Sequence, residues 1–337
     1  MSYLLALDQG TTSSRAIIFD EHGKVHATAQ RETHIKTPHS GWVEQDAQEI
    51  WTTQIAVVQQ AMASARILAK DIKALGLTNQ RETTVVWDKR TGTPLAPAII
   101  WQDRRAAEWC NSLLQNNKMD KIHKTTGLRI DPYFSAGKLV WLLQHIDGLR
   151  ELAQQGHVAF GTIDSWLIWN LTQGSQHVIE VSNASRTMLM NLKTQQWDAE
   201  LLDLFDIPHS VLPTIIRSDE YVANTAPGLL GAEIPIAGVM GDQQSALFGQ
   251  SCFEIGTAKN TYGTGCFMLF NTGEKLQYSH NQLLTTLAWN CQNKTSYALE
   301  GSVFMAGAIV QWLRDGLGII KNSTEVEKLA CQVNSTD

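Results

Sequence analysis

An acidic residue followed by a hydroxyl-rich turn lies close to the start of the chain, in the string Asp8–Arg15 (DQGTTSSR). Turns of glycine, threonine and serine expose backbone N–H groups and hydroxyls, which together can hold phosphate oxygens. A carboxylate beside such a turn can reach Mg²⁺ through water, because Mg²⁺ keeps part of its hydration shell. The string therefore favours a phosphate and metal site, and a plain hairpin turn is the alternative.

A second turn of the same kind occurs at Gly263-Thr264-Gly265, between two strand-like segments. Alone, a G-x-G turn is weak support for phosphate binding, but the two turns together predict a phosphate site held from two sides. The sequence contains no G-x-x-x-x-G-K-[ST] string, which excludes a P-loop. No dinucleotide-binding fingerprint follows the first apolar segment either.

Three further residues have the chemistry to bind and activate a polyol. Arg81 and Glu82 are adjacent at the end of a predicted strand, where the chain can turn both side chains towards one cleft. A donor fork beside a carboxylate suits a molecule whose hydroxyls both donate and accept hydrogen bonds. Asp242 follows another predicted strand and could accept the proton of an attacking hydroxyl. Taken alone, the adjacent pair favours a surface salt bridge, and an isolated Asp242 favours a helix N-cap.

The elements that must position these residues follow from apolar periodicity and turn residues. Short loops join the apolar runs at 4–7, 16–19 and 25–29, so we expect an antiparallel meander. Apolar residues at helical spacing predict a long helix that begins at Asp46. We also expect strands at 72–77 and 234–240, a hairpin of 85–87 with 98–101, helices at 104–116 and 136–155, and a second strand–turn–strand unit at 259–270.

Composition limits the class of protein. The chain has 337 residues, of which 43% are hydrophobic, enough to bury at least one large core and to form two domains. A net charge of −6 without a basic run argues against nucleic-acid binding and against a membrane surface. Five scattered cysteines and the lack of a signal-peptide pattern predict reduced thiols and a cytoplasmic protein without membrane insertion.

Several long strings resemble segments of the FGGY carbohydrate kinases. Tyr133–His145 (YFSAGKLVWLLQH) is similar to the first signature of that family, and the other matching strings occur in the family's order. Within the family, they are most similar to the members that phosphorylate glycerol. The other strings are LDQGTTSSRAIIF (7–19), TNQRETTVVWD (78–88), IIWQDRR (99–105), GTIDSWLIWNL (161–171), NASRTM (183–188), GDQQSA (241–246) and NTYGTGCF (260–267).

The resemblance implies an α/β, actin-like (ribonuclease H-like) fold of two lobes, with mixed sheets flanked by helices. Residues 1–250 would form the N-terminal lobe, and residues 251–337 the start of the C-terminal, nucleotide-binding lobe. The implied reaction is ATP- and Mg²⁺-dependent phosphorylation of glycerol to sn-glycerol 3-phosphate in glycerol catabolism, by in-line transfer of the γ-phosphoryl group. Relatives of this kind form dimers or tetramers, so a homo-oligomer is expected.

The resemblance also assigns roles to individual residues. Asp242 would be the catalytic base, and Asp8 would help to place Mg²⁺. Glycerol would be hydrogen-bonded by Arg81, Glu82, Tyr133, Asp242 and Gln243, with Trp101 and Phe267 as walls around its carbon chain. The nucleotide would be bound by Thr11, Thr12, Ser13, Arg15, Thr264, Gly307 and Gln311.

Family members continue beyond the last residue of this sequence, so the second lobe is expected to be incomplete. We therefore expect a formed glycerol site with weakened ATP affinity. Two alternatives stay open: another FGGY kinase acting on xylulose or gluconate, and a catalytically impaired form that still binds glycerol. The adjoining Arg81 and Glu82, with Trp101, favour the small triol over a longer sugar.

Overall fold

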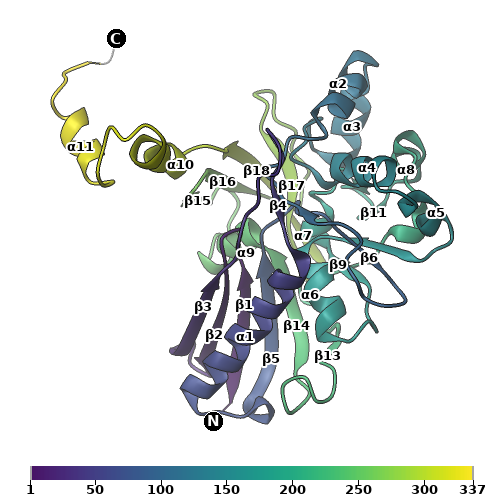
Figure 1. The fold of residues 1–337 in the computed structure, drawn as a ribbon, viewed down its shortest axis with the longest axis vertical. Helices are drawn as coiled ribbons and strands as arrows, with labels where there is room; N and C mark the ends of the chain where they lie inside the picture. The colour runs from purple at the N-terminus through teal and green to yellow at the C-terminus, as the bar shows by residue number, and fades with distance from the viewer. Residues whose placement is uncertain (1, 336–337) are drawn as a thin grey trace.

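A computed structural model describes residues 2–335, and its first layer is a six-stranded sheet (Figure 1). Strands β1 (Tyr3–Gln9), β2 (Ser13–Asp20) and β3 (Val25–Glu32) form the predicted antiparallel meander. Strands β5 (Ile72–Asn79) and β14 (Pro235–Gly241) continue the sheet parallel to β1. A short antiparallel strand, β13 (Ala223–Asn224), closes the edge and gives the order β13-β14-β5-β1-β2-β3.

Helix α1 (Ala47–Ala65) covers one face of this sheet, and Figure 1 shows it lying across β1 and β2. It begins where predicted, because the Asp46 carboxylate accepts hydrogen bonds from the backbone N–H groups of Gln48 and Glu49. Its apolar stripe, which includes Ile50 and Val57, packs on alternating strand residues in one core cluster. Helix α6 (Ile163–Leu171) joins the same core.

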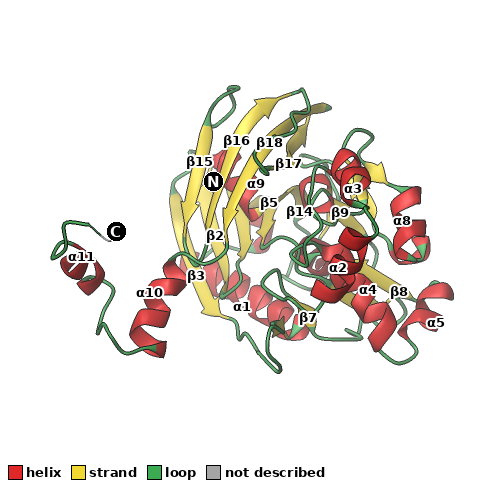
Figure 2. Ribbon diagram, turned by 90° about the horizontal axis from the view of Figure 1, so that it is seen from above, coloured by secondary structure: helices red, strands yellow, loops and turns green. Residues whose placement is uncertain are grey.

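The second sheet has four antiparallel strands in the order β15-β16-β18-β17 (Figure 2). Its first two strands flank the second predicted turn, at residues 263–265. The strands are β15 (Ala258–Tyr262), β16 (Cys266–Gly273), β17 (Leu284–Cys291) and β18 (Lys294–Val303). Helix α9 (Asp242–Gly249) leaves β14 of the first sheet and buries Leu247 against Leu269 and Ala298 of the second, so it connects the two sheets.

A helical region lies beside the two sheets and has its own hydrophobic core. Its helices are α2 (Ala107–Gln115), α3 (Met119–Thr126), α4 (Ser135–His145), α5 (Leu149–Gln154) and α8 (Ala199–Phe205). The short helix α7 (Val181–Ala184) packs instead with Leu287 and Tyr297 of the second sheet in a separate cluster. The remaining short strands pair as β6 (Val85–Asp88) with β8 (Val158–Gly161), β4 (Glu44–Gln45) with β7 (Ala98–Ile99), β9 (Val178–Glu180) with β12 (Thr214–Ile216), and β10 (Met190–Asn191) with β11 (Gln196–Trp197).

Two predicted elements differ from the structure. The predicted hairpin of 85–87 with 98–101 is reduced to isolated antiparallel bridges, Thr84 to Ile99 and Trp87 to Pro94, because β6 takes the distant strand β8 as its regular partner. The predicted helix at 136–155 is two helices, since the chain turns at Gly148, which has a φ of 72°.

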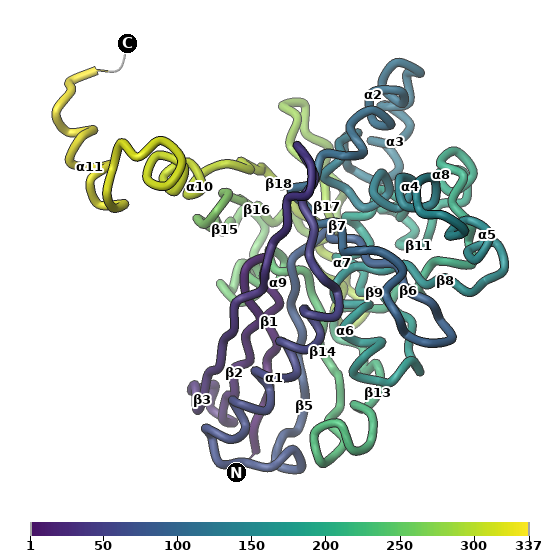
Figure 3. Tube along the Cα trace, in the orientation of Figure 1, coloured from purple at the N-terminus to yellow at the C-terminus, as the bar shows by residue number. Residues whose placement is uncertain are grey.

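The last described segment projects away from the body, as the yellow end of the tube in Figure 3 shows. It contains α10 (Gly307–Gln311), a π-helical turn (Trp312–Gly316) and α11 (Glu325–Ala330), and none of these three has a buried residue. Met305 and Trp312 are about half exposed. Among residues 2–335, no helix is both long enough and apolar enough to span a bilayer.

The contact between α3 and β17 gives a test of this packing. Gly127 ends α3 with a φ of 74°, and a Cβ atom there would lie 2.3 Å from the carbonyl oxygen of Thr285. Gly148 has nearly the same φ, but a Cβ atom there would meet nothing within 4 Å. Gly148→Ala should therefore cost only the left-handed backbone penalty, about 1–2 kcal/mol.

Gly127→Ala should cost about 1–3 kcal/mol more than Gly148→Ala, because the methyl group also forces α3 and β17 apart. Urea denaturation of the two variants measures the difference in the free energy of unfolding. Equal losses would show that α3 does not approach β17 as closely as described.

Candidate active site

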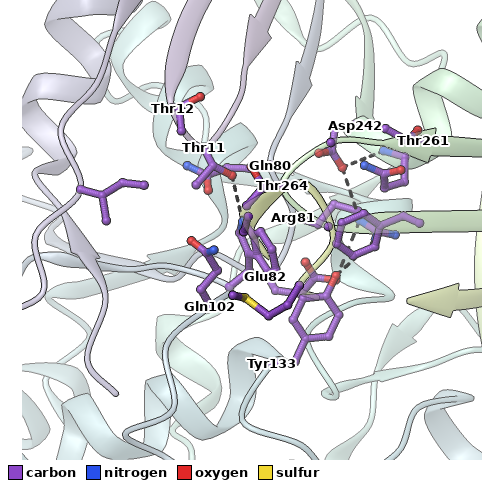
Figure 4. Close-up of a pocket in the computed structure, with 18 of the residues that line it drawn as sticks. Thr11, Thr12, Gln80, Arg81, Glu82, Gln102, Tyr133, Asp242, Thr261 and Thr264 are labelled. Carbon is purple, nitrogen blue, oxygen red and sulfur yellow. Dashed lines mark hydrogen bonds and ion pairs between the residues drawn. The ribbon is translucent and has the colours of Figure 1, made fainter. Parts of the chain in front are cut away.

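A cavity of about 530 Å³ lies where the carboxyl ends of β1, β5 and β14 face the turn between β15 and β16 (Figure 4). Eleven of the residues to which the resemblance assigns a role line it, although they come from distant parts of the chain. They are Thr11, Thr12, Arg81, Glu82, Trp101, Tyr133, Asp242, Gln243, Thr264, Phe267 and Gln311. The cavity also has lining residues that sequence reasoning missed, among them Gln80, Gln102, Thr261 and Met305.

Four singled-out residues lie outside this lining. Asp8 and Arg15 are opposite each other on β1 and β2, with 3.6 Å between Oδ2 and Nη1, and each side chain is more than one third exposed. Ser13 begins β2, and its hydroxyl accepts a hydrogen bond from the Gln30 amide. The backbone N–H of Gly307 donates to the carbonyl of Gly263, so α10 begins directly on the second turn.

The backbone at Glu82 explains how two adjacent side chains reach one cavity. Glu82 has a φ of 62°, a left-handed conformation uncommon for a residue other than glycine. Its carbonyl oxygen accepts hydrogen bonds from the Ser135 hydroxyl and the Lys138 ammonium group, both at 3.1 Å. These donors on α4 hold the turn that follows β5, and the turn breaks the strand alternation that would send Arg81 and Glu82 to opposite faces.

Arg81 and Glu82 each pair more closely with another charged side chain than with each other. Their closest charged atoms, Nε and Oε1, are 3.9 Å apart, and each side chain has a shorter partner of opposite charge. Arg81 donates to both carboxylate oxygens of Glu300, at 2.6 and 2.9 Å. Glu82 accepts from Nε of Arg186 at 2.6 Å, and Arg186 also donates to Glu300 at 2.9 Å. The surface salt bridge considered from the sequence is therefore wrong: all four side chains are buried.

Neither Glu300 nor Arg186 was assigned a role from the sequence. Glu300 interrupts an otherwise mostly apolar strand, Tyr297-Ala298-Leu299-Glu300, and Arg186 lies in the string NASRTM. A charge inside a strand that is to be buried needs a partner of opposite sign, so the signal was present for Glu300. The partner could not be deduced, because Arg81 and Arg186 lie more than one hundred residues away in the chain.

Asp242 is the first residue of α9, and its side chain faces the cavity beside Arg81 (Figure 4). Its Oδ1 lies 3.4 Å from Nε of Arg81 and accepts a hydrogen bond from the backbone N–H of Gln243. Burial raises the pKa of Asp242 to about 6, Arg81 opposes this rise, and the negative charge of Glu82 adds to it. Gly241 precedes the helix as its N-cap, so the interpretation of Asp242 as an N-cap is wrong.

A lysine and an amide stand behind Asp242. The Lys259 ammonium group on β15 contacts the side-chain oxygen of Gln243, the hydroxyl of Thr261 and the carbonyl of Phe267. Burial lowers the pKa of Lys259 to about 8, and the charge of Arg81 adds to the lowering. Lys259 thereby fixes the orientation of the Gln243 amide, which lines the cavity.

Aromatic rings form the apolar side of the cavity. The Trp101 ring lies edge-on to Tyr133 and Phe267, with centroid distances of 6.1 and 5.7 Å. The indole N–H of Trp101 donates to the Thr11 hydroxyl at 2.9 Å, which connects this wall to the first turn. The cavity thus has an apolar wall of aromatic rings next to a group of charged hydrogen-bond donors and acceptors.

The number of carboxylates that meet at one point determines which kind of metal ion the site could hold. Among the described residues, no group of three or more His, Cys, Asp or Glu side chains is arranged around a common point for a metal ion. A hydrated Mg²⁺ that arrives with nucleotide phosphates needs only one or two protein carboxylates. Asp8, at the end of β1, fits such an ion and does not fit a fully protein-coordinated one.

Comparison with known proteins places the chain in a family. Residues 3–249 match the model of the N-terminal domain of the FGGY family of carbohydrate kinases, and residues 258–336 match that of its C-terminal domain. The chain is 77% identical to a glycerol kinase of Acinetobacter baylyi over all of its length and 68% of that protein. It is 56% identical to a glycerol kinase of Deinococcus radiodurans, covering 99% of this chain and 67% of the relative. The chain thus spans about two thirds of these relatives.

Solved structures agree with this placement. The structure of Plasmodium falciparum glycerol kinase with ADP has a TM-score of 0.90 and 36% identity, covering 100% of this chain and 67% of that one. A xylulose kinase from Lactobacillus acidophilus shares the fold, with a TM-score of 0.87 at 21% identity. The match covers 99% of this chain and 66% of the xylulose kinase. The sheet order and these likenesses confirm the actin-like fold class. The chain belongs to the FGGY family of carbohydrate kinases.

Proposed function

We propose that this chain transfers the γ-phosphoryl group of ATP to a terminal hydroxyl of glycerol. The observation that carries the proposal is the placement of Asp242 beside Arg81 and Glu82 in one cavity, in a chain 77% identical to a glycerol kinase. The xylulose kinase and a gluconate kinase of known structure are 21% identical to this chain and share its fold alone. Glycerol is therefore the preferred acceptor.

The polar wall of the cavity suits a small triol. In our proposal the Arg81 guanidinium donates to one glycerol hydroxyl and the Glu82 carboxylate accepts from another. Tyr133 and Gln243 add a phenol and an amide on the same wall. Trp101 and Phe267 face the carbon chain, since their rings form the apolar side.

Asp242 acts as the base for the attacking hydroxyl in this proposal. A carboxylate whose pKa is about 6 is mostly ionised at neutral pH and is a better proton acceptor than an ordinary exposed aspartate. Phosphoryl transfer requires little covalent chemistry from the protein, so the remaining catalysis is positioning and neutralisation of charge. We further expect the two lobes to close around the cavity and to exclude water, which would otherwise compete as the acceptor.

The nucleotide binds on the side of the two turns. We assign the phosphates to backbone N–H groups and hydroxyls of the first turn and to the second turn opposite. The assigned residues are Thr11, Thr12, Ser13, Arg15, Thr264, Gly307 and Gln311. Mg²⁺, held through water by Asp8, would neutralise phosphate charge. We further propose two lobes, residues 1–250 and 251–337, and a cytoplasmic homo-oligomer.

The role of Asp242 is tested by Asp242→Asn, which keeps the shape of the side chain and removes the base. Glycerol-dependent ADP release should fall by about 10²–10⁴-fold. The matched control is Asp203→Asn on the exposed face of α8, which should retain the original rate.

If the Asp242→Asn variant kept the original rate, Asp242 would not be the catalytic base. If glycerol protects the unaltered chain against heat but no ADP is released, the chain is a catalytically impaired form that still binds glycerol. Failure of glycerol both to protect and to be phosphorylated would contradict the proposed acceptor.

The raised pKa of Asp242 also predicts an effect on stability. In the folded chain this carboxyl keeps its proton up to about pH 6, above its ordinary value of 3.8. The folded state therefore binds more protons than the unfolded state between these values, and stability from this group falls as the pH rises through the window. Asp242→Asn removes the penalty, so the variant should have a higher urea midpoint than the original chain at pH 7.5. At pH 3.5 the two midpoints should be nearly equal.

The measurement is a pair of urea titrations at the two pH values for both proteins. A variant that is less stable at pH 7.5 would show that the ion pair with Arg81 outweighs burial. In that case the predicted gain in stability of Asp242→Asn over the unaltered chain at pH 7.5 would be wrong.

A further inference from the structure

Glu300 lies in the middle of β18, in the second sheet, and its side chain is fully buried. It extends to two arginines that belong to the first part of the chain, Arg81 after β5 and Arg186 after α7. Its carboxylate thus connects the second sheet to the residues that line the acceptor side of the cavity. Glu300 itself is absent from the lining of this cavity.

The contacts of Glu300 fix the plane of the Arg81 guanidinium. Both oxygens of Glu300 bind the two terminal nitrogens of Arg81, a bidentate arrangement that leaves Nε to face Asp242 at 3.4 Å. Arg81 also donates to the Tyr133 hydroxyl and the Gln244 amide oxygen, both at 3.3 Å. Paired donor and acceptor forks give geometric specificity that a single contact does not.

Arg186 acts on Glu82 in the same manner. It donates through Nε to Glu82 and through Nη2 to Glu300, while its Nη1 has no hydrogen-bond partner among the described residues. The two carboxylates thus pair with the two guanidinium groups, and the Nη1 nitrogen of Arg186 is left without a partner among the described residues. Glu82 is therefore held by Arg186, and Arg81 is held by Glu300.

We propose that Glu300 is a positioning residue, which holds the Arg81 guanidinium beside Asp242 and towards the acceptor without touching Asp242 or the acceptor itself. The predicted effect of Glu300 on glycerol binding rests on the proposed function. Its predicted effect on the pKa of Asp242 rests on the geometry alone. The charge of Glu300 matters as well as its shape, since it partly neutralises the cation that faces Asp242.

The sign of the electrostatic effect follows from the groups around Asp242. The charged side chains that face it are Arg81 and Glu82 beyond β5 and Lys259 on β15. Glu300→Gln removes a negative charge from behind Arg81 and leaves the Arg81 charge less compensated. The Asp242 anion is then better stabilised, so the pKa of Asp242 should fall below about 6. A purely structural loosening would not produce this shift.

The experiment compares Glu300→Gln with the unaltered chain by two measurements. Isothermal titration at pH 7.5 gives the glycerol dissociation constant, which should rise about tenfold when one charge-assisted contact to Arg81 is weakened. A ¹³C NMR titration of the Asp242 carboxyl carbon, identified by its disappearance in Asp242→Asn, gives the second quantity. Its midpoint should fall by about one pH unit.

The matched control is Asp103→Asn, which alters another buried carboxylate held by an arginine, Arg105, outside the cavity lining. It should lower the thermal midpoint without moving the Asp242 titration. If Glu300→Gln does not fold, Glu300→Asp keeps the charge but shortens the reach. That variant should weaken glycerol binding about tenfold and leave the Asp242 midpoint unchanged.

Unchanged glycerol affinity and an unchanged Asp242 midpoint in a folded Glu300→Gln variant would overturn the inference. Original affinity in Glu300→Asp would overturn it when only that variant folds. If the unaltered chain binds no glycerol, the proposed function fails. The Asp242 titration then still decides whether Glu300 positions Arg81.

Discussion

The cluster of Arg81, Arg186, Glu82 and Glu300 is the interaction on which the site depends. Taking each of these charges out of water costs several kcal/mol, which is recovered only when the opposite charges meet in good geometry. Three of the four residues come from the first part of the chain, and Glu300 comes from the second sheet. The two sheets must therefore be correctly placed before the polar wall of the cavity exists. A shift of β18 would leave two buried guanidinium groups with a single carboxylate.

The same cluster creates two carboxylates with opposite properties. Glu300 is buried between two guanidinium groups, and although burial alone would raise its pKa, Arg186 and Arg81 hold it well below the usual range. Asp242 has one guanidinium at 3.4 Å, with Glu82 nearby, so burial prevails and its pKa rises to about 6. One carboxylate thus stays charged near neutral pH and has a structural role, and the other is poised to exchange a proton in that range. In this account the chemistry assigned to Asp242 arises from its surroundings.

Much of the fold could be predicted from local pattern, and much of the site could not. The meander β1–β3 and the start of α1 follow from alternation, short turns and the Asp46 cap, all of which are local. The pairing of β6 with β8 joins segments about seventy residues apart. The predicted local hairpin therefore does not form as a regular strand pair. The left-handed turn at Glu82 and the partners of Glu300 depend on groups that meet only in the folded chain. The family resemblance assigned Arg81, Glu82 and Asp242 their roles, and these roles remain predictions.

A crystal structure of this chain grown with glycerol would show whether the buried charge cluster forms the acceptor site. We expect glycerol in the cavity, with a terminal hydroxyl within hydrogen-bonding distance of the Asp242 carboxylate. We also expect a second hydroxyl between Arg81 and Glu82, while Glu300 and Arg186 keep their contacts to those two side chains. Glycerol bound elsewhere, or bound with Arg81 turned away from Glu300, would contradict the claim that the buried charge cluster forms the acceptor site.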